Sequence, residues 1–270
     1  LAAVLVMAVF GLGLSGVSWL TTLGFKAPPI EVKRPALESG ALLVYLVLYA
    51  VLLLGYGLSA VREAFPPGQQ YKLVVMALKL AAHVALPALL LLALGARLAP
   101  LWQAGVGRWQ FWLTLVVPGG IILALLCVIS PSLRNIAATN TPLSTLLWIA
   151  PVSFVWVAIE AGLNEEFLFR AVLQTRLSAW FNSAWAGVFV TAIVFGVAHV
   201  PGLFLRGGAD VHGSSADLLQ VIAYAIAVLA PMGLLFGLIY ARTKSLLLVV
   251  LLHGLVDVLP GLPEFIETWT

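Results

Sequence analysis

Three short groups of polar residues lie inside an otherwise apolar sequence, and their side chains are those used in acid–base chemistry. The groups are Glu165-Glu166-x-x-x-Arg170, Phe195-x-x-x-His199 and His253-x-x-x-Asp257. An ionisable side chain at membrane depth costs roughly 2.5 kcal/mol or more. Only 9% of the residues are charged. A concentration of ionisable groups in such surroundings therefore indicates an active site.

The first group places two carboxylates and a guanidinium on one helix. Glu166 and Arg170 are four residues apart, so they share a helix face and can form an ion pair. Glu165 points away from that face, which leaves its carboxylate available as a general base acting on water. The alternative interpretation is structural, because the Glu166–Arg170 pair alone also suits a polar network between packed helices.

The second and third groups each place two side chains on one helix face. Phe195 suits an apolar wall, and a lone histidine such as His199 is more often a hydrogen-bonded packing residue than a catalyst. His199 is therefore a candidate catalytic residue only in combination with the other two groups. His253 and Asp257 are also four residues apart, so Asp257 can orient His253 or share a ligand with it. An intrahelical hydrogen bond that tightens packing is the alternative for this pair.

Composition indicates the setting of these groups. Hydrophobic residues make up 62% of the chain and the mean hydropathy is +1.09, whereas soluble domains contain roughly 45–50% apolar residues. Apolar runs near the length of about 20 residues that crosses a bilayer recur along the chain without the alternation of barrel strands. We expect an all-α polytopic membrane protein with about eight transmembrane helices, at 3–24, 41–61, 72–95, 109–130, 144–177, 182–201, 217–241 and 245–260.

All three polar groups lie in the C-terminal half of the chain. We expect N-terminal transmembrane helices at 1–143, a catalytic core of the last four helices at 144–260, and a C-terminal tail at 261–270. Lys79 and His83 share a face of the third span without an acidic neighbour in the sequence, and Lys79 is expected to extend towards the interface. The net charge of +3 is scattered, which argues against nucleic acid as a partner.

The order and spacing of the three groups resemble the motifs of the CPBP intramembrane protease family. This family joins CAAX prenyl endopeptidases of the Ras-converting type with bacteriocin-processing and immunity proteins. The resemblance covers roughly residues 144–260, and the first four spans match only in being hydrophobic. It implies an intramembrane endopeptidase whose partners are the lipid bilayer and a membrane-associated or lipid-anchored peptide or protein.

The resemblance also implies a role for each motif residue. Glu165 and His199 would activate a water for attack on a peptide carbonyl, while His253 and Asp257 would stabilise the oxyanion. The residues Glu166, Arg170 and Phe195 would support the site. The last motif position is often asparagine in the family, and an ionised Asp257 would repel an oxyanion. Asp257 would then be protonated, orient His253, or bind a metal.

Two mechanisms remain open for this set of residues. We favour a metal-free mechanism based on the glutamate, without a cofactor. The alternative is a zinc metalloprotease with His199, His253, Asp257 and Glu165 as ligands, since histidines and carboxylates form zinc sites with an open position. No His-Glu-x-x-His helix is present to favour zinc.

Proteins of other classes also place charges in a membrane. A transporter would be expected to have related halves, but the deep ionisable residues concentrate in the second half. A non-catalytic scaffold or immunity protein would not need all of Glu165, His199 and His253. The sequence does not set the oligomeric state or say whether the substrate is prenylated. We expect a multi-pass protein of a bacterial or archaeal cell membrane.

Overall fold

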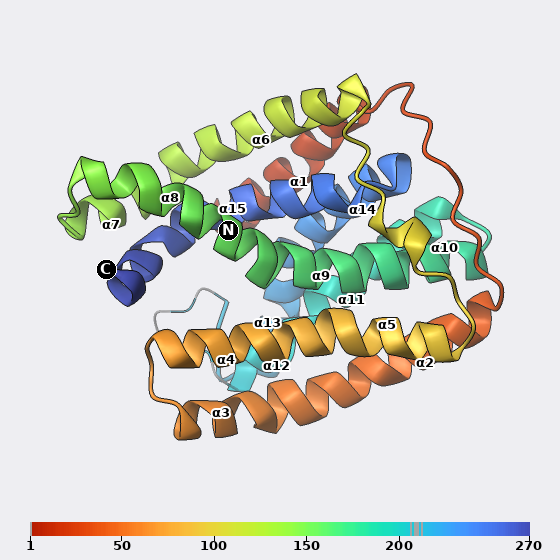
Figure 1. Ribbon diagram of the computed structural model, residues 1–270, viewed down its shortest axis with the longest axis horizontal. Coiled ribbons are helices and arrows are strands. Elements are labelled where there is room, and N and C mark those ends of the chain that lie inside the picture. The colour runs from red at the N-terminus through yellow and green to blue at the C-terminus, as the bar shows by residue number, and fades with distance from the viewer. Residues whose placement is uncertain (1, 206, 208–210, 212) are drawn as a thin grey trace.

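The computed structural model describes residues 2–205, 207, 211 and 213–270, with side chains from residue 11 onward. This part of the chain is 81% helical and contains no strand, which confirms the predicted all-α fold (Figure 1). The α-helices are α1 (Ala2–Thr21), α2 (Pro35–Tyr49), α3 (Leu58–Ala64), α4 (Gln69–Leu80), α5 (Leu86–Ala93), α6 (Trp109–Ile129), α7 (Ser132–Ala138), α8 (Leu143–Val157), α9 (Asn164–Glu166), α10 (Thr175–Trp180), α11 (Ala184–Ala198), α12 (Val200–Leu205), α13 (Leu218–Tyr224), α14 (Ala230–Thr243) and α15 (Leu246–Trp269).

Several long helices include a π-helical stretch between two α-helices. These stretches are η1 (Ala50–Gly57), η2 (Ala81–Ala85), η4 (Ala158–Leu163), η5 (Phe167–Gln174) and η6 (Ala225–Leu229), and a short 3₁₀ helix, η3 (Ala99–Trp102), precedes α6. A π-helical turn shifts the face that the following residues present, and such turns are frequent at functional sites. Two of them, η4 and η5, flank the three residues of α9 that carry the paired glutamates.

Seven helices of the described chain are long and apolar enough to cross a membrane. They are Pro35–Ala64, Gln69–Ala93, Trp109–Ile129, Leu143–Trp180, Ala184–Leu205, Leu218–Thr243 and Leu246–Trp269. Each corresponds to one of the predicted spans after the first. The first predicted span, 3–24, corresponds to α1, a helix of 20 residues whose side chains before residue 11 lie outside the described part.

Turn residues and caps set the ends of these helices, as their chemistry predicts. Pro35 begins α2 at a position where a missing N–H is tolerated. The Ser183 side chain accepts the Ala186 N–H at the start of α11, and Ser245 accepts the Leu248 N–H at the start of α15. At its other end α15 continues to Trp269, well beyond the predicted end at 260, although Pro260 and Pro263 lie within it. The division of the chain at residue 144 stays a prediction.

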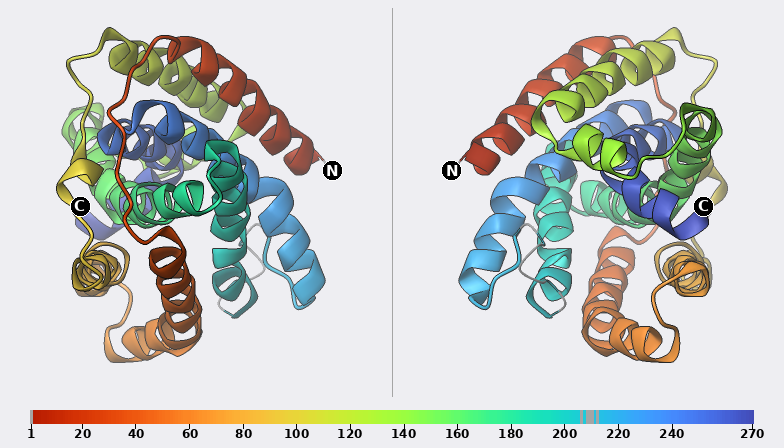
Figure 2. Two further views of the ribbon diagram at one scale, coloured as in Figure 1. Left: turned by 90° about the vertical axis from the view of Figure 1, so that its right-hand side faces the viewer. Right: turned by 90° about the vertical axis from the view of Figure 1, so that its left-hand side faces the viewer.

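The C-terminal helices form the centre of the molecule. α15 packs against η4, α8 and α6, while α14 packs against α11 and α1. The end-on views of Figure 2 show α2–α4 and α12–α13 extending from the same face of this centre, on opposite sides. Many large apolar side chains are exposed on the described spans, as lipid contact requires, whereas Glu166, Arg170 and Arg176 are fully or almost fully buried.

Candidate active site

The buried glutamate of the first group lies at the centre of a polar chain. Glu166 Oε2 is 3.1 Å from Arg170 Nε, and both side chains are completely buried. The Arg170 guanidinium lies over the Phe195 ring, 4.3 Å from its centroid, and near the rings of Phe169 and Phe236. Aromatic faces attract a guanidinium. The ion pair and this aromatic surround together accommodate a charge that would otherwise be unfavourable at this depth.

The other oxygen of Glu166 orients the histidine of the third group. Glu166 Oε1 is 2.7 Å from His253 Nδ1, and the His253 ring stacks on Phe236 with an interplanar angle of 10°. A carboxylate only accepts hydrogen bonds, so Nδ1 carries a hydrogen in this contact. Nε2 then points away from Glu166, towards Asp257 Oδ2 at 3.3 Å and Glu165 Oε2 at 3.8 Å. Glu166 therefore contacts the Nδ1 side of the His253 ring, and Asp257 contacts the Nε2 side.

A backbone carbonyl orients the histidine of the second group. His199 directly follows α11, and its Nδ1 lies 2.8 Å from Phe195 O. Because a carbonyl oxygen can only accept, Nδ1 is the donor, and the Nε2 of a neutral ring keeps its lone pair. Nε2 lies 4.0 Å from Glu165 Oε2. The Phe195 ring packs edge-on against His199, so Phe195 touches both His199 and Arg170.

Close helix packing brings these groups together. A Cβ on Gly162, in η4, would lie 2.7 Å from Val250 O in α15. A Cβ on Gly254, next to His253, would lie 3.0 Å from Ala158 Cβ. At Gly162 a Cβ would collide with a backbone oxygen, and at Gly254 the neighbouring Ala158 would have to shift to admit one. As a result, Glu165, His199, His253 and Asp257 converge although they come from three different helices.

A cavity of about 340 Å³, here called the Glu165 cavity, opens beside this cluster. The N-terminal helices contribute to it as well as the C-terminal ones. Its lining comprises Tyr49, Leu54, Leu58, Lys79, His83, Glu160, Asn164, Glu165, Phe169, Ala198, His199, Gly202, Leu203, Gly207 and Val211. Most of this lining is apolar, and the polar groups gather around Glu165 and Glu160.

Lys79 and His83 were not expected among these lining residues. Lys79 forms an ion pair with Glu160 instead of extending towards the interface, and His83 hydrogen-bonds with Tyr49. The sequence indicated part of this arrangement, since Lys79 and His83 lie four residues apart in an apolar span and so share a helix face. It did not indicate Glu160 as the partner, because that residue is distant in the sequence.

The arrangement of the same side chains bears on whether the site fits a metal ion. Among the residues that the structure describes, no group of three or more His, Cys, Asp or Glu side chains is arranged to hold a metal ion. No step proposed below therefore runs through a metal.

Comparison with known proteins identifies the region that contains all three groups. A family model described as Type II CAAX prenyl endopeptidase Rce1-like matches residues 146–259. The match covers less than half of the 270 residues and includes all three groups of polar residues. At the level of the family, this match supports a CAAX-type intramembrane protease, a class that acts on membrane proteins or peptides. No curated protein and no solved structure matches the chain.

Proposed function

We propose that the chain is an endopeptidase that hydrolyses a peptide bond in a membrane-associated or lipid-anchored protein or peptide, using water activated by Glu165 and His199. The observation that carries this proposal is the 4.0 Å separation between Glu165 Oε2 and His199 Nε2. One water can donate a hydrogen to each of these two acceptors, which leaves an oxygen lone pair free for attack. Phe195 O supports the arrangement by holding the opposite nitrogen of His199.

Hydrolysis needs one group that accepts a proton from the water and one group that donates a hydrogen bond to the oxyanion. Glu165 takes a proton from the water as its oxygen attacks the peptide carbonyl, and the carbonyl π electrons move to its oxygen. His253 donates a hydrogen bond from Nε2 to this oxyanion. When the C–N bond breaks, Glu165 returns the proton to the leaving nitrogen, giving a carboxylic acid and an amine.

Asp257 has an indirect role in this proposal. Its Oδ2 lies 3.3 Å from His253 Nε2, on the same side as Glu165. Because Nδ1 already donates to Glu166, a hydrogen on Nε2 as well makes His253 an imidazolium, and the Asp257 carboxylate favours this charged form, which can donate to an oxyanion. The proposal therefore assigns Asp257 to holding His253 in its donating form, instead of contacting the oxyanion.

The lining of the Glu165 cavity supports an apolar substrate. Leu54 and Leu58 come from the N-terminal half, while Phe169 and Leu203 come from the C-terminal half. A lipid-anchored or membrane-embedded segment would bury apolar surface between them. The bacterial or archaeal membrane expected from the sequence stays a prediction.

A cleavage assay with a matched pair of variants tests the proposal. The purified protein in lipid nanodiscs is given a prenylated peptide or the same peptide without the lipid, and the products are mapped by mass spectrometry. Glu165→Gln removes the proton acceptor and should lower the rate by about 10²–10⁴-fold. Glu63→Gln, the same change at an exposed position of α3, should leave the rate unchanged.

Three outcomes decide among the alternatives. Full activity of Glu165→Gln would reject the mechanism. Activity that a zinc chelator removes and zinc restores would replace it with the metalloprotease alternative. Absence of cleavage of every membrane peptide by the unmodified protein would favour a non-catalytic scaffold.

A further inference from the structure

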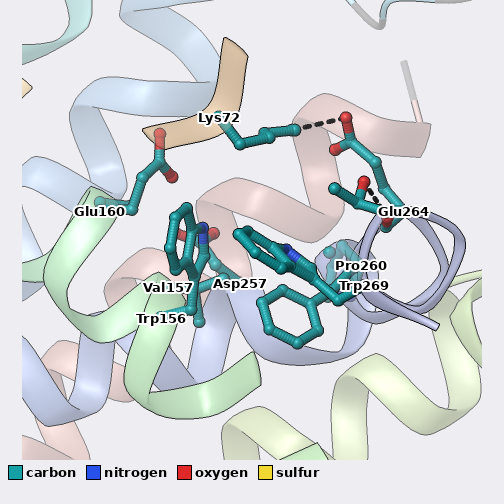
Figure 3. Close-up of a pocket in the computed structure, with 12 residues that line it drawn as sticks. Lys72, Trp156, Val157, Glu160, Asp257, Pro260, Glu264 and Trp269 are labelled. Atoms are coloured by element: carbon teal, nitrogen blue, oxygen red, sulfur yellow. Dashed lines mark hydrogen bonds and ion pairs between the residues drawn. The ribbon is translucent and has the colours of Figure 1, made fainter. Parts of the chain in front are cut away.

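A second cavity lies on the other side of Glu160. This Lys72 cavity has a volume of about 310 Å³ and is lined by Lys72, Trp156, Val157, Glu160, Ala161, Asp257, Pro260, Gly261, Glu264, Phe265, Thr268 and Trp269. Figure 3 shows Glu160 and Glu264 on either side of Lys72, with Trp156 and Trp269 beside them. The space is far larger than the roughly 10–15 Å³ that one water needs.

The two cavities differ in the chemistry of their walls. The Lys72 cavity has four charged side chains, including the carboxylates of Glu160, Asp257 and Glu264. The Glu165 cavity is also lined by Lys79, Glu160 and Glu165, but most of its exposed wall is apolar. Water stays in a cavity only where polar partners hold it. The Lys72 cavity suits water, whereas the Glu165 cavity suits an apolar substrate.

The Lys72 cavity reaches from the ends of two helices to the catalytic cluster. Lys72 pairs with Glu264, and Gln69 Nε2 donates to Thr268 O, so the start of α4 meets the end of α15 at its mouth. At its inner end Asp257 lies 3.3 Å from His253 Nε2. That nitrogen is in turn 3.8 Å from Glu165 Oε2, a separation that one water can bridge.

Glu160 forms the wall between the cavities, since it lines both of them. Lys79, in α4, forms an ion pair with the Glu160 carboxylate. The Asn164 side chain donates a hydrogen bond to the Glu160 backbone carbonyl at 3.0 Å. This wall is polar on both faces. A polar boundary of this kind can hold water, whereas it is unfavourable for an apolar segment.

We propose that the Lys72 cavity is the aqueous vestibule of the site, supplying water to Glu165 past Asp257 and Glu160. This inference rests on the proposed hydrolysis, because a hydrolase within a bilayer needs water at a depth from which lipid excludes it. It separates two routes: the substrate occupies the Glu165 cavity, and water arrives through the Lys72 cavity.

Thiol accessibility tests the route without requiring proteolysis. The only cysteine is replaced in a Cys127→Ser background, and Ala161→Cys is introduced, since Ala161 lines the Lys72 cavity but not the Glu165 cavity. In nanodiscs, a charged thiosulfonate reagent should modify this cysteine without unfolding the protein. The control Gly120→Cys lies on an exposed face within the α6 span and should react much more slowly.

Filling the cavity should close the route. A Cβ on Gly261 would meet only Val157 Cγ1, at 3.6 Å, so Gly261→Leu extends into the cavity without a backbone clash. It should slow the modification of Ala161→Cys by about tenfold, a modest increase in the barrier. Gly120→Leu, with nothing within 4 Å of its Cβ, should leave the modification unchanged. Thr268→Trp at the mouth is the second variant if Gly261→Leu does not fold.

Activity adds a separate measurement. With the native Cys127 restored, Gly261→Leu should lower kcat and leave KM for an apolar substrate unchanged, because the Glu165 cavity is untouched. The vestibule is rejected if Ala161→Cys reacts only after unfolding, or if filling the cavity alters neither the labelling rate nor kcat. Failure of the hydrolase proposal would instead appear as absent cleavage with the labelling pattern intact.

Discussion

At the scale of single residues, the two adjacent glutamates have different environments and different partners. Glu166 is completely buried between Arg170 and His253, whereas Glu165 retains some exposure and lies between two imidazole Nε2 atoms. Their positions on the helix cause this difference, because consecutive residues point about a third of a turn apart. This difference supports the proposal that Glu166 orients the site and that Glu165 carries out the chemistry.

Separate effects on stability and activity are expected for the Glu166–Arg170 pair. Glu166→Met leaves a buried guanidinium unpaired and should destabilise the protein by roughly 3–5 kcal/mol. Glu166→Met combined with Arg170→Met removes both charges and should recover most of that loss. Both variants should cleave slowly, because His253 Nδ1 has lost its acceptor. Thermal unfolding in detergent and the cleavage assay give the two quantities; a fully active double variant would contradict the role of Glu166.

At the scale of elements, glycine contacts decide how closely the two principal helices of the site approach. Gly162 in η4 faces the backbone of Val250, and Gly254 in α15 faces Ala158. The π-helical turns η4 and η5 lie on either side of the paired glutamates. Their wider backbone changes which side of the long helix Glu165 and Glu166 occupy relative to a regular α-helix.

Gly162→Ala should therefore strain the packing of η4 against α15 and move these two elements apart. Its Cβ would lie 2.7 Å from Val250 O, which belongs to the backbone and cannot rotate away. We expect a loss of about 1–3 kcal/mol in stability and a lower kcat, since Glu165 moves away from His253. Gly120→Ala is the control, because nothing lies within 4 Å of its Cβ and alanine favours a helix by about 1 kcal/mol. Equal behaviour of the two variants in unfolding and cleavage would refute this account.

At the scale of the whole molecule, the N-terminal helices contribute to the site beyond their hydrophobicity. Tyr49, Lys79 and His83 line the Glu165 cavity, and Lys79 pairs with Glu160. A second ion pair joins the halves at another position: Arg176 Nε donates to Glu38 Oε2 at 3.1 Å, with both side chains almost fully buried. Glu38 also accepts the Arg34 N–H at the start of α2.

Arg176→Gln should loosen the attachment of α2 to α10. Removing the guanidinium leaves the Glu38 carboxylate buried without its charge partner, at an expected cost of roughly 3–5 kcal/mol. Hydrogen exchange should then become faster in α2 than in α14. Arg134→Gln removes the same charge from an exposed position of α7 and should leave exchange unchanged. Uniform protection in both variants would show that the ion pair does not hold the halves together.

Local patterns in the sequence were sufficient for the fold class, and they nominated the candidate site residues, whose roles stay predictions. Apolar runs of bilayer length predict the spans, and four-residue spacings place Glu166 with Arg170 and His253 with Asp257. Only the tertiary structure decided that Glu166 reaches His253, that Lys79 pairs with Glu160, and that the N-terminal helices line the Glu165 cavity. The physical reason is that hydrophobicity and helical period act along one segment, whereas these contacts depend on close approach between helices far apart in the chain, such as that at Gly162 and Gly254.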